Sequence, residues 1–309
     1  MIHIVKKHEP KELKEYRESE SSTGVRPTYD SISSDLHEYV LSKLVEEQGG
    51  LCAYCMCRIP ESDKKTGSTL KCTIEHIEPQ SLTRGTENWK KELEYSNFLA
   101  VCSGNENRGA LCCDKSRGNK KLFLTPLNPE CNHLIQYSLS GKIQAAETIP
   151  DKEDRKELDH ELNDILNLND GKDLKAKRKS ALDGMLSVLQ KQDKDQDIEE
   201  CRRKLRELEA PRGQKVEYVG ILIYWLKKHI QRLIVKRGYL RFIYPLGPEL
   251  GLELVVIFVS RVTNLLKNII NLVRICQCQC ASVLECQSIL FQLNLSQVHS
   301  VKIQACNLP

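Results

Sequence analysis

Four cysteines in the first half of the chain have the spacing of a structural zinc site. Cys52 and Cys55 form a C-x-x-C pair, whose thiolates can both reach one zinc ion from a tight turn. Two more thiolates would close a tetrahedral site, and the candidates are Cys102 with either Cys112 or Cys113, of which we prefer Cys113. The connecting loops are long, but the entropy of loop closure grows slowly with length, so zinc can still join them.

An acidic side chain and an imidazole are adjacent in the segment TIEHIEP, which lies between these cysteines. Glu75 can hold a hard divalent cation, and His76 can take a proton from an attacking water, so the pair suits metal-assisted hydrolysis. The flanking isoleucines indicate the end of a strand, where adjacent side chains point to opposite faces. A twisted ribbon or a bulge would be needed to bring both groups to one site.

Two polar residues near the later cysteines are further candidates. Asn97 precedes an apolar, strand-like run and can hydrogen-bond the backbone across a loop, which would fix a neighbouring histidine. An ordinary turn cap is the alternative role for this side chain. Asp114 or Asn119 can complete the hydrolytic cation site, because both supply oxygen ligands.

A basic patch lies close to the last of these cysteines. It suits contacts with phosphate groups, although a run of charges can also be a solvated face. Its members are Arg108, Lys115, Arg117, Lys120 and Lys121.

Hydrophobic periodicity predicts the elements that must position these side chains. Met1–Val5 reads as a short strand, and a short helix is expected around Lys11–Arg17. Ser33 or the next serine can cap a helix running from about Asp35 to Gln48. Residues 216–236 predict an amphipathic helix, which is either the last core helix of the body or a helix that docks a partner.

Composition indicates a soluble globular protein, with 40% apolar and 28% charged residues. The net charge of +4 does not by itself indicate nucleic-acid binding. The N-terminus lacks the apolar core of an export signal, so we expect a cytoplasmic location. In that compartment the fourteen cysteines favour metal ligands or free thiols over disulfides. The stretch 275–301 contains Glu285 and five glutamines, so we expect no membrane span.

The distribution of charge divides the chain. Residues 238–309 hold 8 charged residues in 72, against 80 in the first 237. We therefore expect a lead-in strand and helices at 1–49, a core at 50–125, a helical region at 126–237 and an atypical low-charge tail. The tail is either a small extra helical element or a segment outside the native fold, and we expect it to be dispensable for catalysis.

Together, the motifs resemble the zinc-stabilised form of the HNH endonuclease motif. In that form a C-x-x-C is followed by an acidic residue and His, then Asn, then a second cysteine pair with a basic-Gly sequence. The segments MIHIVKKHEPKELKEY, EEQGGLCAYC, IEHIEPQS and CDKSRGN resemble more closely the HNH nuclease subunit of Septu-type anti-phage defence, the PtuB-like family, relatives of which accompany some retrons. The resemblance covers roughly residues 1–230.

This resemblance implies an α+β fold in which a zinc-stabilised ββα-metal (HNH) core is embedded in a mostly helical body. His76 would be the general base, Glu75 and Asp114 would hold a catalytic Mg²⁺ or similar divalent cation, and Asn97 would orient the histidine loop. Many relatives carry His or Asn where this chain has Asp114, so Ser116 and Asn119 remain alternatives. The structural Zn²⁺ would be held by Cys52, Cys55, Cys102 and Cys113.

The resemblance also implies partners. The substrate would be nucleic acid, with DNA favoured and RNA, such as tRNA, the alternative, and an ABC-type ATPase subunit would work beside the nuclease. A competing interpretation is a non-catalytic, zinc-stabilised module that binds nucleic acid or the ATPase, in which Glu75 and His76 are packing residues.

Overall fold

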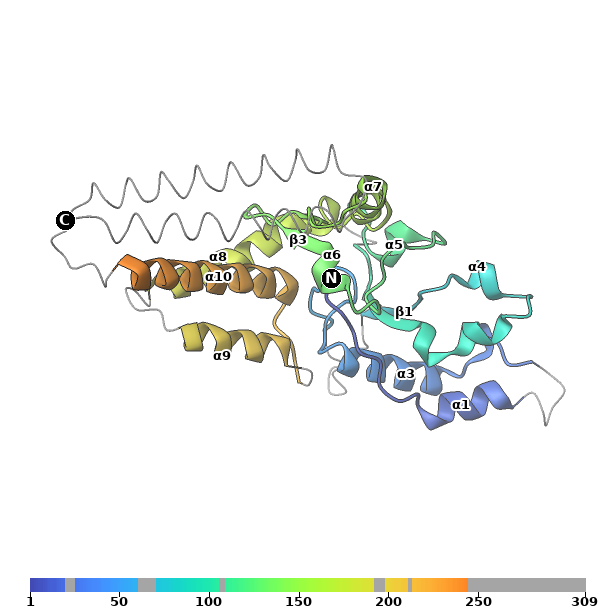
Figure 1. The fold of residues 1–309 in the computed structure, drawn as a ribbon. Coiled ribbons are helices and arrows are strands. Elements are labelled where there is room, and N and C mark those ends of the chain that lie inside the picture. The colour runs from blue at the N-terminus through green and yellow to red at the C-terminus, as the bar shows by residue number, and fades with distance from the viewer. Residues whose placement is uncertain (20–25, 61–70, 106–108, 192–197, 211–212, 244–309) are drawn as a thin grey trace, which may run out of the picture. The chain divides into compact units, whose positions relative to one another are not determined.

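The computed structural model describes residues 1–19, 26–60, 71–105, 109–191, 198–210 and 213–243. The chain divides into two compact units, Met1–Ile234 and Val235–Pro309. The first unit combines helices with two small antiparallel sheets, so the expected α+β class is confirmed (Figure 1). Most of the atypical tail, from residue 244 onward, lies outside the described residues.

The N-terminal helices form close to where the sequence predicted them. Helix α1 spans Lys11–Glu18, a 3-10 turn spans Tyr29–Ser31, and α3 spans Ser34–Glu47. The Ser33 side chain caps α3 by accepting a 3.3 Å hydrogen bond from the Leu36 amide. The predicted strand at Met1–Val5 is wrong: this segment is irregular, although the Ile4 amide donates to the Pro126 carbonyl at 2.8 Å.

An antiparallel hairpin of two strands lies at the centre of the predicted core region. Strand β1 (Cys72–His76) pairs with β2 (Phe98–Cys102) in regular register, from Cys72 opposite Cys102 to His76 opposite Phe98. The connection holds the short helix α4 (Gln80–Thr83) and the 3-10 turns Trp89–Leu93 and Tyr95–Asn97. The single-turn helix α5, Asp114–Arg117, follows the hairpin.

The remaining described elements are helices, helical turns and a second hairpin, which the sequence did not predict. Its two strands are only three residues long each, too short for a clear alternation of apolar and polar residues. In chain order the elements are α6 (Cys131–Leu134), β3 (Ile135–Tyr137), β4 (Ile143–Ala145), α7 (Lys152–His160), a π-helix (Glu161–Ile165), a 3-10 turn (Gly171–Asp173), α8 (Leu174–Lys191), α9 (Ile198–Glu209) and α10 (Val219–Ile243).

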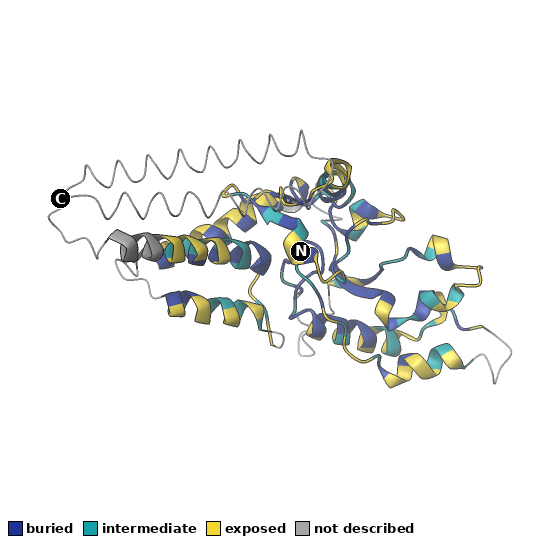
Figure 2. Cartoon of the chain, viewed as in Figure 1, coloured by how far each residue is buried: buried dark blue, intermediate teal, exposed yellow. Residues whose placement is uncertain are grey.

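Strand β2 is buried along its whole length because it has a hydrophobic cluster on each face (Figure 2). Phe98 and Ala100 pack with the apolar face of α3, whereas Leu99 and Val101 pack with the cysteines and the helical region. This alternation is the two-residue period of a strand. The hairpin therefore has little freedom to shift, and the residues at its end are held by both clusters.

Helix α10 packs its apolar face into the larger cluster. Val219, Ile221 and Leu226 have no exposed surface, and Leu222 and Ile230 are 6% exposed. This burial supports the core interpretation of the amphipathic stretch 216–236. Among the described residues, no helix is both long and apolar enough to cross a membrane.

Candidate functional site

The first cysteine pair lies on a tight turn between α3 and β1. The Cys52 amide donates to the Cys57 carbonyl, and the Met56 amide donates to the Cys52 carbonyl, each at 3.0 Å. Met56 adopts a positive φ of 62°, which reverses the chain immediately after Cys55. The turn thus directs both sulfur atoms to the same side.

The second pair of sulfur ligands comes from the end of β2 and from the residue before α5. Cys102 is the last residue of β2. Cys113 has a φ of 57°, uncommon for a residue other than glycine, and its amide donates to the Leu166 carbonyl at 2.9 Å. Its backbone is therefore fixed by a segment more than fifty residues further along the chain.

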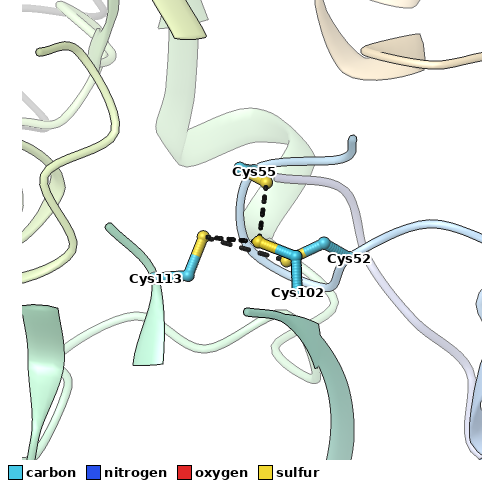
Figure 3. Close-up of side chains that lie close together, drawn as sticks. All are labelled: Cys52, Cys55, Cys102 and Cys113. Atoms are coloured by element: carbon cyan, nitrogen blue, oxygen red, sulfur yellow. Dashed lines mark hydrogen bonds between the residues drawn. The ribbon is translucent and has the colours of Figure 1, made fainter. Parts of the chain in front are cut away.

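The four sulfur atoms meet in a buried cluster (Figure 3). All lie within 4.8 Å of one another, and three Sγ–Sγ distances, Cys52–Cys113, Cys55–Cys102 and Cys102–Cys113, are 3.8 Å. A tetrahedral zinc site with Zn–S bonds of about 2.3 Å has sulfur atoms about 3.8 Å apart. The distances are too long for disulfides and match such a site, so the cluster fits a closed metal centre.

The structure brings Cys113 into this cluster, and Cys112 lies beside it. Cys112 is buried, and its Cβ faces Gly171, where an added Cβ would come within 2.6 Å. The arrangement agrees with the preference for Cys113 that the sequence motif gave.

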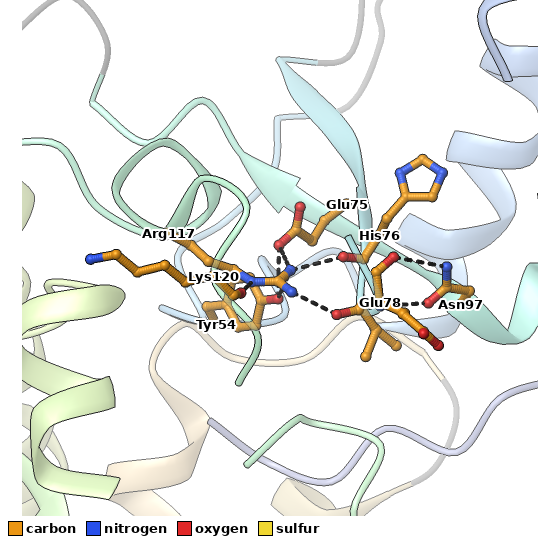
Figure 4. A network of polar contacts seen from close by, with 8 residues as sticks. Tyr54, Glu75, His76, Glu78, Asn97, Arg117 and Lys120 are labelled. Carbon is orange, nitrogen blue, oxygen red and sulfur yellow. Dashed lines mark hydrogen bonds and ion pairs between the residues drawn. The ribbon is translucent and has the colours of Figure 1, made fainter. Parts of the chain in front are cut away.

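Glu75 points from the end of β1 toward α5 (Figure 4). Its side chain is 5% exposed, and its Oε1 accepts hydrogen bonds from the Tyr54 hydroxyl at 3.0 Å and from the Arg117 guanidinium. Burial raises the pKa of Glu75 to about 8, an effect that Arg117 opposes and the neighbouring Asp114 carboxyl strengthens. Two carboxyl groups therefore lie together at this point, an arrangement that a divalent cation would stabilise in its ionised form.

His76 is directed away from Glu75, as the regular strand register requires (Figure 4). No bulge interrupts the register, so the two side chains are not brought to one side of the strand by the twist or bulge that the sequence analysis considered. The imidazole is 8% exposed, and its Nε2 lies 3.0 Å from the Glu92 carbonyl oxygen. Burial lowers the pKa of His76, an effect that Glu92 opposes most and Asp114 opposes less.

Asn97 bridges the backbone around the histidine. Its Oδ1 accepts from the Glu78 amide at 2.8 Å, and its Nδ2 donates to the carbonyls of Lys91 at 2.9 Å and Glu78 at 3.3 Å. Because Glu92, whose carbonyl contacts His76, follows Lys91 directly, these bonds fix the loop that holds the imidazole. This is the backbone-bridging geometry that the sequence position suggested.

The basic residues after Cys113 divide into two groups. Lys115, Lys120 and Lys121 are exposed, whereas Arg117 is 1% exposed and fully engaged inside the protein. Its guanidinium donates to Glu75, to the carbonyls of His76 and Ile77 at 2.8 and 2.6 Å, and to the Lys120 carbonyl at 2.8 Å. Arg117 is therefore not placed to bind phosphate; it ties α5 to the end of β1. Arg108 lies outside the described residues.

Three residues around the site were not singled out from the sequence. Tyr54 lies inside the C-x-x-C and binds Glu75, so its place in that motif was a usable signal. Tyr29 packs on His76 with ring centroids 4.6 Å apart, and Glu92, which is 4% exposed, contacts both of them. These two lie far along the chain from the motif residues they touch, so no local spacing could reveal them.

Comparison with known proteins gives one relevant similarity. No protein-family model matches the chain. A protein of Vibrio cholerae serotype O1 biovar El Tor, named "Retron Vc95 putative HNH endonuclease", is 26% identical over 144 residues, 46% of this chain. The match covers 65% of that protein, slightly less than two thirds of its length.

Proposed function

We propose that this protein is an HNH-type, metal-dependent endonuclease that hydrolyses phosphodiester bonds of nucleic acid. The observation that carries the proposal is that Arg117 ties α5, which begins at Asp114, to Glu75 and to the backbone of His76, directly beside a four-cysteine cluster. The similarity to a protein named as an HNH endonuclease supports the same class of activity. In this proposal β1, β2 and α5 are the ββα-metal core.

The four-cysteine cluster has a structural role in this proposal. Cys52, Cys55, Cys102 and Cys113 would hold a zinc ion with all four positions filled by thiolate, which leaves no place for substrate. Zinc binding there joins the turn before β1, the end of β2 and the start of α5. The cluster thereby fixes the elements that carry Glu75 and Asp114.

His76 is the general base in the proposed reaction. Since a carbonyl oxygen can only accept a hydrogen bond, the contact with Glu92 places the proton on Nε2 and leaves the lone pair on Nδ1. Nδ1 then takes the proton of the water that attacks phosphorus, so no covalent enzyme intermediate forms. Lowering of the His76 pKa by burial keeps the ring neutral, which a base requires.

The carboxyl groups of Glu75 and Asp114 have the oxygen donors that fit a hard divalent cation. One oxygen of Glu75 is engaged by Tyr54 and Arg117, so the other oxygen is the proposed ligand. A cation such as Mg²⁺ bound there would stabilise the charge that develops on the phosphate and the leaving oxygen. Exposed Lys115, Lys120 and Lys121 would position the nucleic-acid backbone.

Cleavage assays on the purified full-length chain test this proposal. Supercoiled plasmid and total tRNA are incubated separately with the protein in Mg²⁺ or in EDTA, and His76→Ala is the matched variant. Cleavage that requires the divalent cation and is lost in His76→Ala supports the enzyme, and the substrate that is cut distinguishes DNA from RNA. We expect DNA to be cut. Equal cleavage by the variant would contradict His76 as the base.

A non-catalytic module is the second candidate, and the burial of His76 between aromatic rings favours it. In that case neither nucleic acid would be cut with any divalent cation, but the protein would still bind nucleic acid or a partner. The same assay, combined with a binding measurement, separates the two candidates.

The role in anti-phage defence and an ABC-type ATPase partner are proposed from the sequence resemblance and from the retron name of the similar protein. Co-purification with an ABC-type ATPase expressed in the same cells would test the partner. Recovery of the nuclease without that ATPase, under conditions where both are expressed and soluble, would contradict it.

A further inference from the structure

Two aromatic rings hold the imidazole of His76. Tyr29, in the 3-10 turn Tyr29–Ser31, lies edge-to-face against it, with centroids 4.6 Å apart and an interplanar angle of 83°. Phe98, opposite His76 in the hairpin, lies against it at 4.9 Å and 80°. The Tyr29 and Phe98 rings also contact each other at 5.9 Å. The imidazole therefore cannot rotate without displacing one of them.

The segment that carries Tyr29 is anchored at several points. The Tyr16 hydroxyl donates to the Thr28 carbonyl at 2.9 Å, and Arg84 pairs with Asp30 at 3.0 Å. The Tyr29 hydroxyl lies 3.0 Å from Nε2 of His37, on helix α3. These contacts come from three different parts of the fold. Polar contacts as well as apolar packing therefore hold the Tyr29 ring in place.

Glu92 connects this segment directly to the histidine. Its carboxylate Oε1 accepts a 2.8 Å hydrogen bond from the Tyr29 amide, and its backbone oxygen accepts the hydrogen bond from Nε2 of His76. Arg84 reaches the same carboxylate at 3.5 Å. One residue thus holds both the imidazole and the ring that packs on it, which couples their positions.

We propose that Tyr29 is a positioning residue of the nuclease site, which fixes the imidazole of His76 through its ring. This inference rests on the proposed function, and it adds an N-terminal segment to a site otherwise built from the hairpin and α5. Tyr29 holds the ring of His76 in the plane that directs Nε2 to Glu92 and keeps Nδ1 available for water. Small misplacements of a reacting group are costly, about 10²-fold in rate for a 1 Å shift.

Tyr29→Leu tests the proposal, because leucine keeps an apolar side chain but removes the flat ring. In single-turnover cleavage by the full-length protein, we expect the maximal rate to fall about 10- to 100-fold, with the half-saturating substrate concentration within about twofold of wild type. Zinc content should be unchanged. Tyr29→Phe keeps the ring and should restore the rate to within about threefold, since it loses only the hydrogen bond to His37.

Tyr39→Leu is the matched control, because Tyr39 is a half-exposed tyrosine on α3 without contact to the site, and it should cleave like wild type. Arg84→Ala is a second variant that loosens the Tyr29 segment from outside the core, since Arg84 is half-exposed. It should lower the maximal rate in the same direction by a smaller factor, and it serves if Tyr29→Leu does not fold.

Three results would overturn the proposal. They are a wild-type rate in Tyr29→Leu or Arg84→Ala, an equal loss in Tyr29→Phe, or an effect only on the half-saturating concentration. Failure of the proposed function is distinguishable, because wild type would then cut neither nucleic acid, or His76→Ala would cleave as well as wild type. If His76→Ala is inactive while folded Tyr29→Leu is fully active, only the positioning role is wrong.

Discussion

Arg117 on helix α5 donates a 2.8 Å hydrogen bond to the backbone oxygen of His76 on strand β1. Helix α5 begins directly after Cys113, so a single helical turn connects the fourth sulfur of the cluster to the end of the strand. The four-cysteine cluster and the residues proposed for hydrolysis are therefore mechanically joined. Substitutions in one are expected to affect the other through α5.

Arg117→Ala should destabilise the protein rather than only weaken substrate binding. The substitution removes the donor that Glu75 and the carbonyls of His76 and Ile77 share, and each buried polar group left unsatisfied costs about 1–3 kcal/mol. Thermal unfolding measures the loss, and Lys121→Ala, at an exposed site, is the control. An unchanged melting temperature in Arg117→Ala would contradict this structural role and favour a contact of Arg117 with phosphate.

Lys120→Ala/Lys121→Ala should weaken nucleic-acid binding without loss of stability. Both lysines are exposed, and each phosphate contact that is lost reduces the slope of log K against log salt by about 1. To measure that slope, each double variant is made in the His76→Ala background, so that the nucleic acid is not cut. A labelled oligonucleotide is then titrated with each protein at several salt concentrations. Lys152→Ala/Lys156→Ala on α7 removes the same charge elsewhere. Identical slopes for the two double variants would place the nucleic acid on another surface.

Cys113→Ser should lose the metal, whereas Cys112→Ser should keep it. Only Cys113 belongs to the cluster of four sulfur atoms within 4.8 Å, and removing one thiolate withdraws metal-binding energy that the fold needs. Zinc content per chain, measured on each purified variant, checks this, and Cys102→Ser should behave like Cys113→Ser. A full zinc content in Cys113→Ser, with loss of zinc in Cys112→Ser, would show that Cys112 is the ligand instead of Cys113.

His76→Ala should lower the cleavage rate by about 10²–10⁴-fold, the usual contribution of a general base. Because the imidazole is buried between Tyr29 and Phe98, we also expect a loss of roughly 1–3 kcal/mol in the free energy of unfolding. Single-turnover rates and urea unfolding separate the two effects. His160→Ala, at an exposed position on α7, is the control, and it should change neither quantity.

Glu161 should make the fold less stable as pH rises. It is 1% exposed at the start of the π-helix, and burial raises its pKa to about 7, an effect that hydrogen bonds from the Leu124 and Phe123 amides oppose. Between the unfolded value near 4.5 and about 7, the folded state binds the extra proton. The free energy of unfolding therefore falls with increasing pH across this window, by at most about 1.4 kcal/mol per pH unit.

Glu161→Gln removes this titration, so the pH dependence of its unfolding between pH 4.5 and 7 should be shallower than that of wild type. Urea unfolding at several pH values measures the slopes. Glu130→Gln, at an exposed position before α6, is the matched control and should keep the wild-type slope. Parallel curves for wild type and Glu161→Gln would show that backbone hydrogen bonds keep Glu161 ionised throughout.

The sequence predicted those features that depend on local spacing. The C-x-x-C turn, the capped helix α3 and the bridging position of Asn97 each follow from residues close together in the chain. The strand expected at Met1–Val5 failed because alternation alone does not supply a partner strand, and the hydrogen bonds of this segment go to the Pro126 carbonyl and to the side chains of Asn132 and Tyr137.

The features that the sequence missed depend on burial and on long-range contacts. Arg117 lies in a run of basic residues, and its charge alone indicates a phosphate contact, but its side chain is enclosed by the end of β1. Tyr29 lies far from His76 in sequence, so its place over the imidazole follows only from how α1, α3 and the hairpin pack. Residue type was informative in both cases, but the environment decided the role.

The hydrogen bond from the Cys113 amide to the Leu166 carbonyl has a consequence for protein synthesis. The turn with Cys52 and Cys55 leaves the ribosome first, but its sulfur partners and the segment that fixes the last of them follow much later. A nascent chain that ends before residue 166 lacks the contact that sets the backbone of Cys113, so α5 is then held only by the contacts of Arg117 with the end of β1. With the proposed function, incomplete chains would cut nucleic acid less well than complete ones, which would protect the cell from unfinished copies.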